Sequence, residues 1–199
     1  LQIEKEILSK GKTLSVLNKD YQFNFDTKDL KQFSKFNTIA IIGMGGSILG
    51  AEAIECFLKQ KISKDLYFFD NLSEKKIESF KKKNKIKKTL FIVVSKSGNT
   101  IETITNLFLL NPIKEKKNII IITEKKNNFL YSLSKKSGYF YVEHKNFIGG
   151  RYSVLSEPGI IPAYLMGINI LKLRSKIRES LNGKLQNFLK DSSIKLADL

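Results

Sequence analysis

The sequence predicts an α/β domain with a doubly wound, five-stranded parallel sheet in the strand order 2-1-3-4-5. From residue 37 onward, short continuous apolar runs alternate with amphipathic segments of helical period. This alternation is typical of buried parallel strands that helices cover on both faces. Loops rich in glycine and hydroxyl groups directly follow the first and third runs. In the predicted strand order these two loops flank the crevice where ligands bind.

The expected strands are apolar, mostly β-branched or aromatic runs bounded by polar residues. They cover residues 38–42, 66–69, 89–94, 118–122 and 139–142. The helices between them cover residues 48–58, 73–83, a segment that opens at residue 101, and residues 127–136. Three of these helices carry apolar residues at helical spacing, which predicts the face that each turns to the core. The residues are Ile77 and Phe80, then Ile101, Ile104, Leu107 and Phe108, then Phe129, Leu130 and Leu133. Ser73 is the expected cap of the second helix.

Three parts of the chain are predicted. Residues 1–36 form an N-terminal arm whose Phe33 and Phe36 pack on the domain, residues 37–175 form the sheet domain, and residues 176–199 form a C-terminal helical segment.

The alternation of strands and helices stops after residue 151. Ser156 and Pro158 then indicate a cap with proline in the first turn of a long apolar helix that runs to about Leu173. A break at residues 180–183 precedes a last amphipathic segment, with Leu185, Phe188 and Leu189.

Charge and composition narrow the classes of partner. The net charge is +16 in 199 residues, but arginine occurs only at positions 151, 174 and 178. Proteins that read nucleic acids favour arginine for its bidentate geometry, so we expect no nucleic acid partner and keep that class as a distant alternative. The longest apolar run, residues 159–171, is too short to span a bilayer, so we expect no membrane partner.

Cysteine and histidine are each present once. Cys56 is expected in the core of its helix, and a single cysteine fits a reducing compartment, which predicts a cytoplasmic protein. His144 is expected to be an exposed loop residue. No Cys/His cluster has the spacing of metal ligands, so neither a metal nor a cofactor is expected.

The loop after the third expected strand has the composition of a phosphate-binding site. Ser95, Ser97 and Thr100 supply three hydroxyls, and Gly98 lets the backbone approach a ligand closely. The start of the following helix offers unpaired N–H groups and a partial positive charge to an anion. The alternative is an ordinary polar turn in which Thr100 caps the helix.

The loop after the first strand reads Gly43-Met44-Gly45-Gly46-Ser47 and opens a helix. Its glycines allow a sharp turn and a close approach to a ligand. The pattern is not the dinucleotide fingerprint G-x-G-x-x-G, although Asp70 lies about 24 residues beyond Gly46. Nucleotide binding and a tight turn without a ligand therefore remain as alternatives.

Arg151 lies within Gly149-Gly150-Arg151-Tyr152-Ser153, in a chain that is nearly free of arginine. Its permanently charged guanidinium can neutralise a carboxylate, a phosphate or a developing enolate. The alternative is a structural ion pair with one of the 19 acidic residues.

Together, residues 43–50 (GMGGSILG), 95–103 (SKSGNTIET) and 149–156 (GGRYSVLS) resemble the motifs of the glucose-6-phosphate isomerases, also called phosphoglucose isomerases. The resemblance covers about residues 38–173. The second motif is shared by the wider sugar isomerase (SIS) superfamily, whereas the third is more particular to phosphoglucose isomerases. The resemblance implies a flavodoxin-like SIS domain with extra N- and C-terminal helices.

By position, the resemblance also implies roles for seven residues. The phosphate of the substrate would be bound by the hydroxyls of Ser95, Ser97 and Thr100 and by the backbone N–H of Lys96. Gly46 and Ser47 correspond to substrate-loop residues, and Arg151 to the arginine that stabilises a cis-enediolate intermediate.

The family interconverts glucose 6-phosphate and fructose 6-phosphate, without a cofactor, as homodimers. Its glutamate base, ring-opening histidine and catalytic lysine lie in a second half, the histidine coming from the partner subunit. We therefore expect this chain to be the N-terminal part of such an enzyme. It should expose apolar surface after Gly159 that a second domain would cover, and alone it should bind hexose 6-phosphate weakly without isomerising it. A non-catalytic SIS module and a bifunctional phosphoglucose/phosphomannose isomerase are the alternatives.

Overall fold

A single parallel sheet forms the centre of the computed structural model, which describes residues 2–113, 115–175, 177 and 184–197. Its strand order is β2-β1-β3-β4-β5, as the sequence predicts. The strands are β1 (Thr38–Gly43), β2 (Asp65–Phe69), β3 (Thr89–Val94), β4 (Ile119–Thr123) and β5 (Phe140–Glu143).

The three central strands are buried almost throughout, whereas the two edge strands are only partly buried. Continuous runs of isoleucine and valine are stable there because both faces of the sheet are covered by helices. Neighbouring residues of β1 illustrate the two faces. Ile39 and Ile41 belong to one core cluster, and Ala40 and Ile42 belong to the other.

Helices α2 (Thr27–Leu30), α3 (Leu49–Leu58) and α7 (Glu157–Leu165) cover one face of the sheet. Helices α4 (Glu74–Lys83), α5 (Ile101–Leu110) and α6 (Phe129–Ser137) cover the other face. The fold is therefore a three-layer α/β sandwich, which confirms the predicted class.

Local signals for several elements are confirmed. Ser73 accepts a hydrogen bond from the backbone N–H of Lys76 at 3.3 Å and so caps α4. Ile77 and Phe80 are buried beneath the same helix. In the N-terminal arm, which begins with α1 (Gln2–Leu8), Phe33 and Phe36 are buried against the domain as expected.

The long apolar helix predicted up to Leu173 is wrong, because the chain breaks into α7 and α8 (Ile170–Ser175). Gly167 adopts a positive φ of 93°, a conformation that commonly ends helices. The apolar surface expected to be exposed after Gly159 is absent from α7, although Leu171 of α8 is exposed. All residues of α7 except Tyr164 are buried, because the helix packs between α3 and the segment that precedes it.

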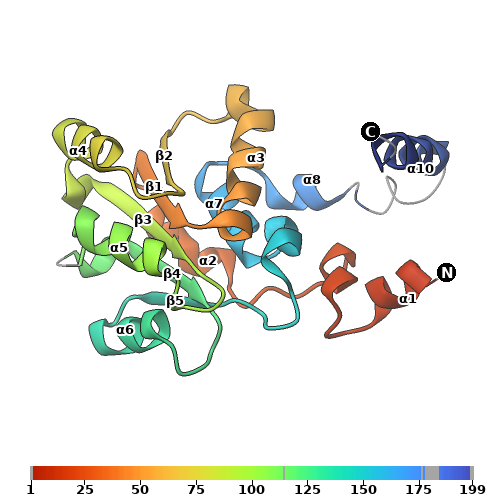
Figure 1. The fold of residues 1–199 in the computed structure, drawn as a ribbon, viewed down its shortest axis with the longest axis horizontal. Helices are drawn as coiled ribbons and strands as arrows, with labels where there is room; N and C mark the ends of the chain where they lie inside the picture. Colours follow the sequence, from red (N-terminus) through yellow and green to blue (C-terminus); the bar gives the residue numbers. More distant parts are fainter. Residues whose placement is uncertain (1, 114, 176, 178–183, 198–199) are drawn as a thin grey trace.

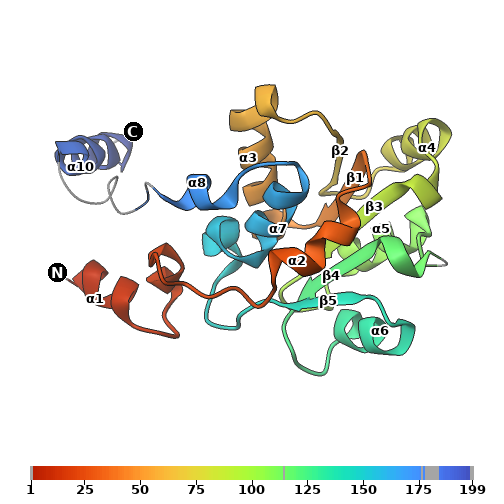
Figure 2. The ribbon, with the colours of Figure 1, turned by 180° about the vertical axis from the view of Figure 1, so that it is seen from behind.

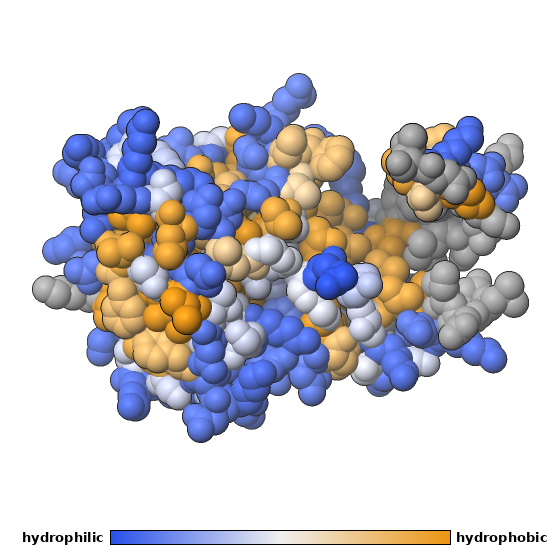
Figure 3. All heavy atoms as spheres, viewed as in Figure 1, coloured by the Kyte–Doolittle hydropathy of each residue, from blue (hydrophilic) through white to orange (hydrophobic). Residues whose placement is uncertain are grey.

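Three helices expose side chains that the sequence analysis places in the core, and Phe129 of α6 is one of these side chains. In α5, Ile101 and Phe108 are exposed, and Leu107 and Leu110 face the core. On the face in Figure 3, hydrophobic side chains gather over α5 and α6. In α3, Cys56 is exposed rather than buried.

The last described element is α10 (Lys184–Ala197), on which Phe188 is exposed. The break predicted at residues 180–183 lies outside the described residues. The division at residues 36 and 175 remains a prediction.

Candidate functional site

The three predicted loops meet at one edge of the sheet because of how β1 pairs with β3. Gly43 and Val94, the last residues of these strands, are direct partners in the parallel register. The two segments that follow these strands therefore leave the sheet side by side, at the same level. A Cβ on Gly43 would lie 2.9 Å from the Val94 carbonyl oxygen, so the glycine loop must begin with a residue that has no side chain.

The hydroxyls of the loop between β3 and α5 converge as predicted. The Oγ of Ser95 lies 2.8 Å from the Oγ1 of Thr100, and the Oγ of Ser97 lies 3.3 Å from the same atom. Thr100 occupies the N-cap position of α5, but its hydroxyl bonds to these serines and caps no helix N–H. The arrangement therefore presents three hydroxyls at a helix start, where an anion is favoured.

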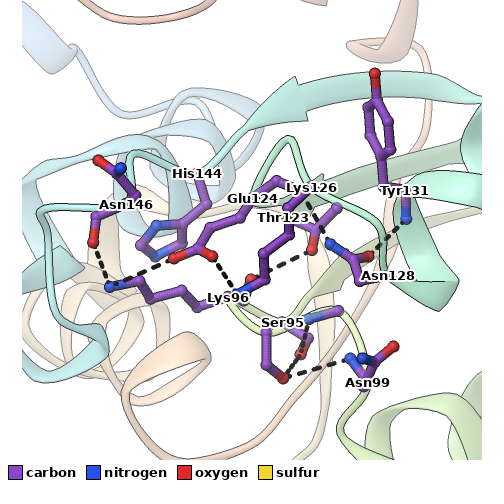
Figure 4. A network of polar contacts seen from close by, with 12 residues as sticks. Ser95, Lys96, Asn99, Thr123, Glu124, Lys126, Asn128, Tyr131, His144 and Asn146 are labelled. Atoms are coloured by element: carbon purple, nitrogen blue, oxygen red, sulfur yellow. Dashed lines mark hydrogen bonds and ion pairs between the residues drawn. The ribbon is translucent and has the colours of Figure 1, made fainter.

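Lys96 directs its side chain away from these hydroxyls (Figure 4). Its Nζ donates to the carbonyl of Asn146 at 2.6 Å and lies 3.6 Å from the carboxylate of Glu124. The Lys96 side chain therefore joins this loop to the segment that leads to Arg151. Only the backbone N–H of Lys96 remains for the anion-binding role that the sequence predicts.

The glycine loop and the turn that carries Arg151 pack directly on each other. A Cβ on Gly46 would lie 2.3 Å from the carbonyl carbon of Gly150. The hydroxyl of Ser153 donates to the carbonyl oxygens of Gly46 at 3.1 Å and Gly150 at 2.6 Å. Glycine at position 46 is thus required by backbone contact, and Ser47 follows in the same short turn. Their contact with a substrate remains a prediction.

Arg151 lies in the 3-10 turn Gly150–Leu155 and is exposed. Among the residues that the structure describes, no acidic side chain forms an ion pair with it. The alternative of a structural ion pair therefore finds no support within this part of the chain. The Arg151 backbone lies against Gly46 of the glycine loop, and its side chain is exposed.

His144 is 1% exposed, so the prediction of an exposed loop histidine is wrong. The N-terminal arm covers this loop, through bonds from Thr13 to the Phe147 carbonyl and from Asn24 to the Glu143 carbonyl. Burial lowers the pKa of His144, and its Nδ1 lies 3.0 Å from the Lys145 carbonyl. The ring is therefore neutral near pH 7, with Nδ1 as the donor.

Sequence reasoning missed Glu157, a fully buried carboxylate in the first turn of α7. It accepts hydrogen bonds from the Tyr21 hydroxyl at 3.0 Å and the Asn24 backbone N–H at 3.1 Å. Burial raises the pKa of Glu157. Burial and the neighbouring Glu157 carboxylate also raise the pKa of Tyr21. The available signal was a carboxylate at the start of an otherwise apolar helix.

Arg174 supports the same junction between the arm and the domain. Its guanidinium donates to the carbonyls of Leu155, Val16 and Asn18 at 2.6 to 2.9 Å. Leu155 ends the turn that carries Arg151, so the N-terminal arm helps to hold this turn in place. The scarcity of arginine was the signal that could have identified this residue.

Asp70 is the acidic residue that bears on the alternative of nucleotide binding. Its Oδ1 forms an ion pair with the Nζ of Lys76 in α4 at 3.2 Å. Within the described ranges, no three His, Cys, Asp or Glu side chains gather in a way that could hold a metal ion. None of the described helices combines the length and the hydropathy needed to cross a bilayer.

Comparison with known families agrees with this geometry. The family model of phosphoglucose isomerase matches residues 18–176, a range that includes all three loops. The chain belongs to the phosphoglucose isomerase family.

Its relatives carry the name of an enzyme. A protein of Methanococcus maripaludis named "Probable glucose-6-phosphate isomerase" is 35% identical over 180 residues. That alignment covers 85% of this chain and 40% of the relative. The glucose-6-phosphate isomerase of Methanocaldococcus jannaschii is 32% identical over 80% of this chain and 40% of its own length. The chain thus spans about two fifths of the length of these relatives.

Solved structures show the same architecture. A glucose-6-phosphate isomerase from Chlamydia trachomatis superposes with a TM-score of 0.62 and 25% identity, over 74% of this chain and 29% of that one. A hypothetical protein from Thermus thermophilus superposes with a TM-score of 0.74 at 23% identity, over 93% of this chain and 48% of that one. The latter supports the fold alone.

The buried neutral His144 predicts a stability that falls in acid. Burial lowers its pKa in the folded state, so as the pH falls through about 6.5 the unfolded chain takes up the proton more readily than the folded chain does. The parent should therefore lose more unfolding free energy than His144→Asn does between pH 7.5 and 5.5. Urea unfolding at both pH values measures this difference. An equal loss in parent and variant would show that His144 does not titrate differently on folding.

Proposed function

We propose that this chain is the phosphate-binding part of a glucose-6-phosphate isomerase, an enzyme that interconverts glucose 6-phosphate and fructose 6-phosphate through a cis-enediolate. The observation that carries the proposal is the convergence of the Ser95, Ser97 and Thr100 hydroxyls, in a loop that leaves the sheet next to the glycine loop on which the Arg151 turn packs. Membership of the phosphoglucose isomerase family supports the reaction class.

In the proposed complex, the phosphate dianion replaces the bonds that the three hydroxyls make to one another. Each hydroxyl keeps its position and turns its proton toward a phosphate oxygen. The backbone N–H of Lys96 and the start of α5 add further donors. Because the donors are neutral, the site can hold a dianion and still release it. Gly46 and Ser47 line the approach to the sugar from the neighbouring strand.

Arg151 is proposed to act on the reacting carbons. Isomerisation moves one proton between C1 and C2, and the enediolate formed on the way carries a negative charge that the bound sugar lacks. A guanidinium fork without a described acidic partner is suited to stabilise that charge. Only such stabilisation beyond that of the bound sugar accelerates the reaction.

The remaining groups are proposed to come from outside this chain. His144 cannot supply ring opening, because it is buried under the N-terminal arm. Glu102 lies in the first turn of α5, a position where acidic residues are common. We therefore assign the glutamate base, the histidine and the lysine to a second domain, in a cytoplasmic homodimer. The same arrangement would also accept mannose 6-phosphate in a bifunctional enzyme.

Removal of two cradle hydroxyls should weaken phosphate binding. Each hydrogen bond to a charged group contributes about 1.5–3 kcal/mol. Ser97→Ala combined with Thr100→Val should therefore reduce the affinity for glucose 6-phosphate more than tenfold by calorimetry. Thr105→Val combined with Ser132→Ala, on the bodies of α5 and α6, is the matched control and should bind as the parent does. Equal affinities of the two double variants would exclude this cradle.

Substitution of Arg151 should weaken the binding of an analogue of the intermediate more than the binding of the substrate. Arg151→Lys keeps the charge but loses the bidentate geometry. It should weaken binding of a hydroxamate analogue of the enediolate at least tenfold, and binding of glucose 6-phosphate by less than threefold, because only the analogue carries the developing charge. Parallel calorimetric titrations of the chain measure both affinities. Equal losses for the two ligands would make Arg151 a simple anchor.

The 199-residue chain by itself should bind hexose 6-phosphate and not isomerise it. General acid and base groups each contribute about 10²–10⁴-fold to the rate, and at least two are assigned elsewhere. A coupled assay that converts glucose 6-phosphate to fructose 6-phosphate tests this expectation. Binding without turnover would also fit a non-catalytic module. That alternative would be excluded if adding the second half of a relative restored activity. Turnover of many per second would place the base within this chain.

A further inference from the structure

The loop that carries the three hydroxyls is attached on its outer side to the start of α6. The Phe129 backbone N–H donates to the side-chain Oδ1 of Asn99 at 2.8 Å. The next N–H, of Leu130, donates to the carbonyl of Gly98 at 3.1 Å. Two of the first N–H groups of α6, which a helix leaves unpaired, are therefore satisfied by this loop.

Asn128 meets the same loop by packing at Gly98, and its own hydrogen bonds hold it in place. Its Oδ1 accepts from the Tyr131 N–H at 2.9 Å and caps α6, and its Nδ2 donates to the Glu124 carbonyl at 3.0 Å (Figure 4). The side chain is 4% exposed and fills the space beneath Gly98. A Cβ on Gly98 would lie 1.9 Å from the Asn128 Oδ1.

The end of β4 also holds the loop. The Thr123 hydroxyl and the Glu124 backbone N–H donate to the carbonyl of Lys96, at 3.4 and 3.3 Å. Bonds to backbone on both sides of Ser97 thus fix the path of the chain that carries its hydroxyl. Gly98 follows with a positive φ of 71°, a conformation that glycine adopts without strain.

This support matters because donors bind an anion well only when they are already in position. The free-energy cost of ordering a loop on binding reduces the favourable binding free energy and so weakens the affinity. Asn99 is exposed and its carboxamide Oδ1 is bonded to α6, so its side chain ties the loop to that helix.

We propose that Asn99 and Asn128 are positioning residues for phosphate binding, which anchor the Ser95–Thr100 loop on the N-terminus of α6 and hold its donors in place for the anion. The inference rests on the proposed function, because it concerns the same phosphate site. It assigns a role to two residues outside the proposed set of phosphate donors.

The first test compares two helix-cap losses. Asn99→Ala removes the bond to the Phe129 N–H at α6, and Ser73→Ala removes the bond to the Lys76 N–H at α4. Both variants should lower the midpoint of thermal unfolding by a few degrees. Only Asn99→Ala should weaken binding of glucose 6-phosphate and of inorganic phosphate, by at least fivefold in calorimetry. Unchanged affinity in Asn99→Ala would overturn the proposal.

The second test separates the cap from the support of the loop. Asn128→Ala loses both, whereas Asn128→Ser restores a hydroxyl that can cap α6 but leaves the space beneath Gly98 unfilled. Asn128→Ser should therefore recover the unfolding midpoint while its phosphate affinity stays at least fivefold below the parent. Recovery of midpoint and affinity together would reduce Asn128 to a helix cap and overturn its positioning role.

The parent chain distinguishes the two levels of inference. If the parent binds neither glucose 6-phosphate nor inorganic phosphate, the proposed function fails, and the positioning role fails with it. If the parent binds both and the Asn99 and Asn128 variants bind equally well, only the positioning role fails.

Discussion

The pairing of β1 with β3 is the constraint on which the rest of the site depends. These strands are distant in sequence, yet their last residues, Gly43 and Val94, are direct partners in the sheet. In a parallel sheet the segments that follow neighbouring strands leave at the same edge, so the glycine loop and the hydroxyl loop must lie side by side. A strand order that placed β1 and β3 apart would separate the groups proposed to bind sugar from those proposed to bind phosphate.

Close backbone packing then places the third loop. Gly46 and Gly150 are in contact through their main chains, and Ser153 bonds to both carbonyls. The turn that carries Arg151 is thus held from one side by the glycine loop. From the other side it is held by α7, whose Glu157 is tied to Tyr21 of the N-terminal arm. The N-terminal arm therefore helps to stabilise the site.

Local chemistry explains which predictions succeeded. The apolar runs of the strands, the Ser73 cap and the hydroxyl cluster depend on residues within a few positions of one another. Predictions of the surroundings of single side chains, and of one helix end, failed. His144 is buried by an arm more than a hundred residues away in sequence, and Cys56 is exposed because Ala51 and Ile54 face the core instead. The long helix failed at Gly167, where a single positive φ redirects the chain.

The α/β class and the three loops with their seven candidate residues could be predicted from the sequence by itself, because strand periodicity and turn chemistry lie in short segments. The strand order could be predicted only as that of a doubly wound fold, and it is confirmed. Only the tertiary structure decided where the side chains of those loops point. It turned the Lys96 side chain toward Asn146, left Arg151 without a described acidic partner, and placed Asn128 beneath Gly98. Each of these outcomes depends on contacts between segments far apart in the chain, and such contacts form only when the sheet has brought them together.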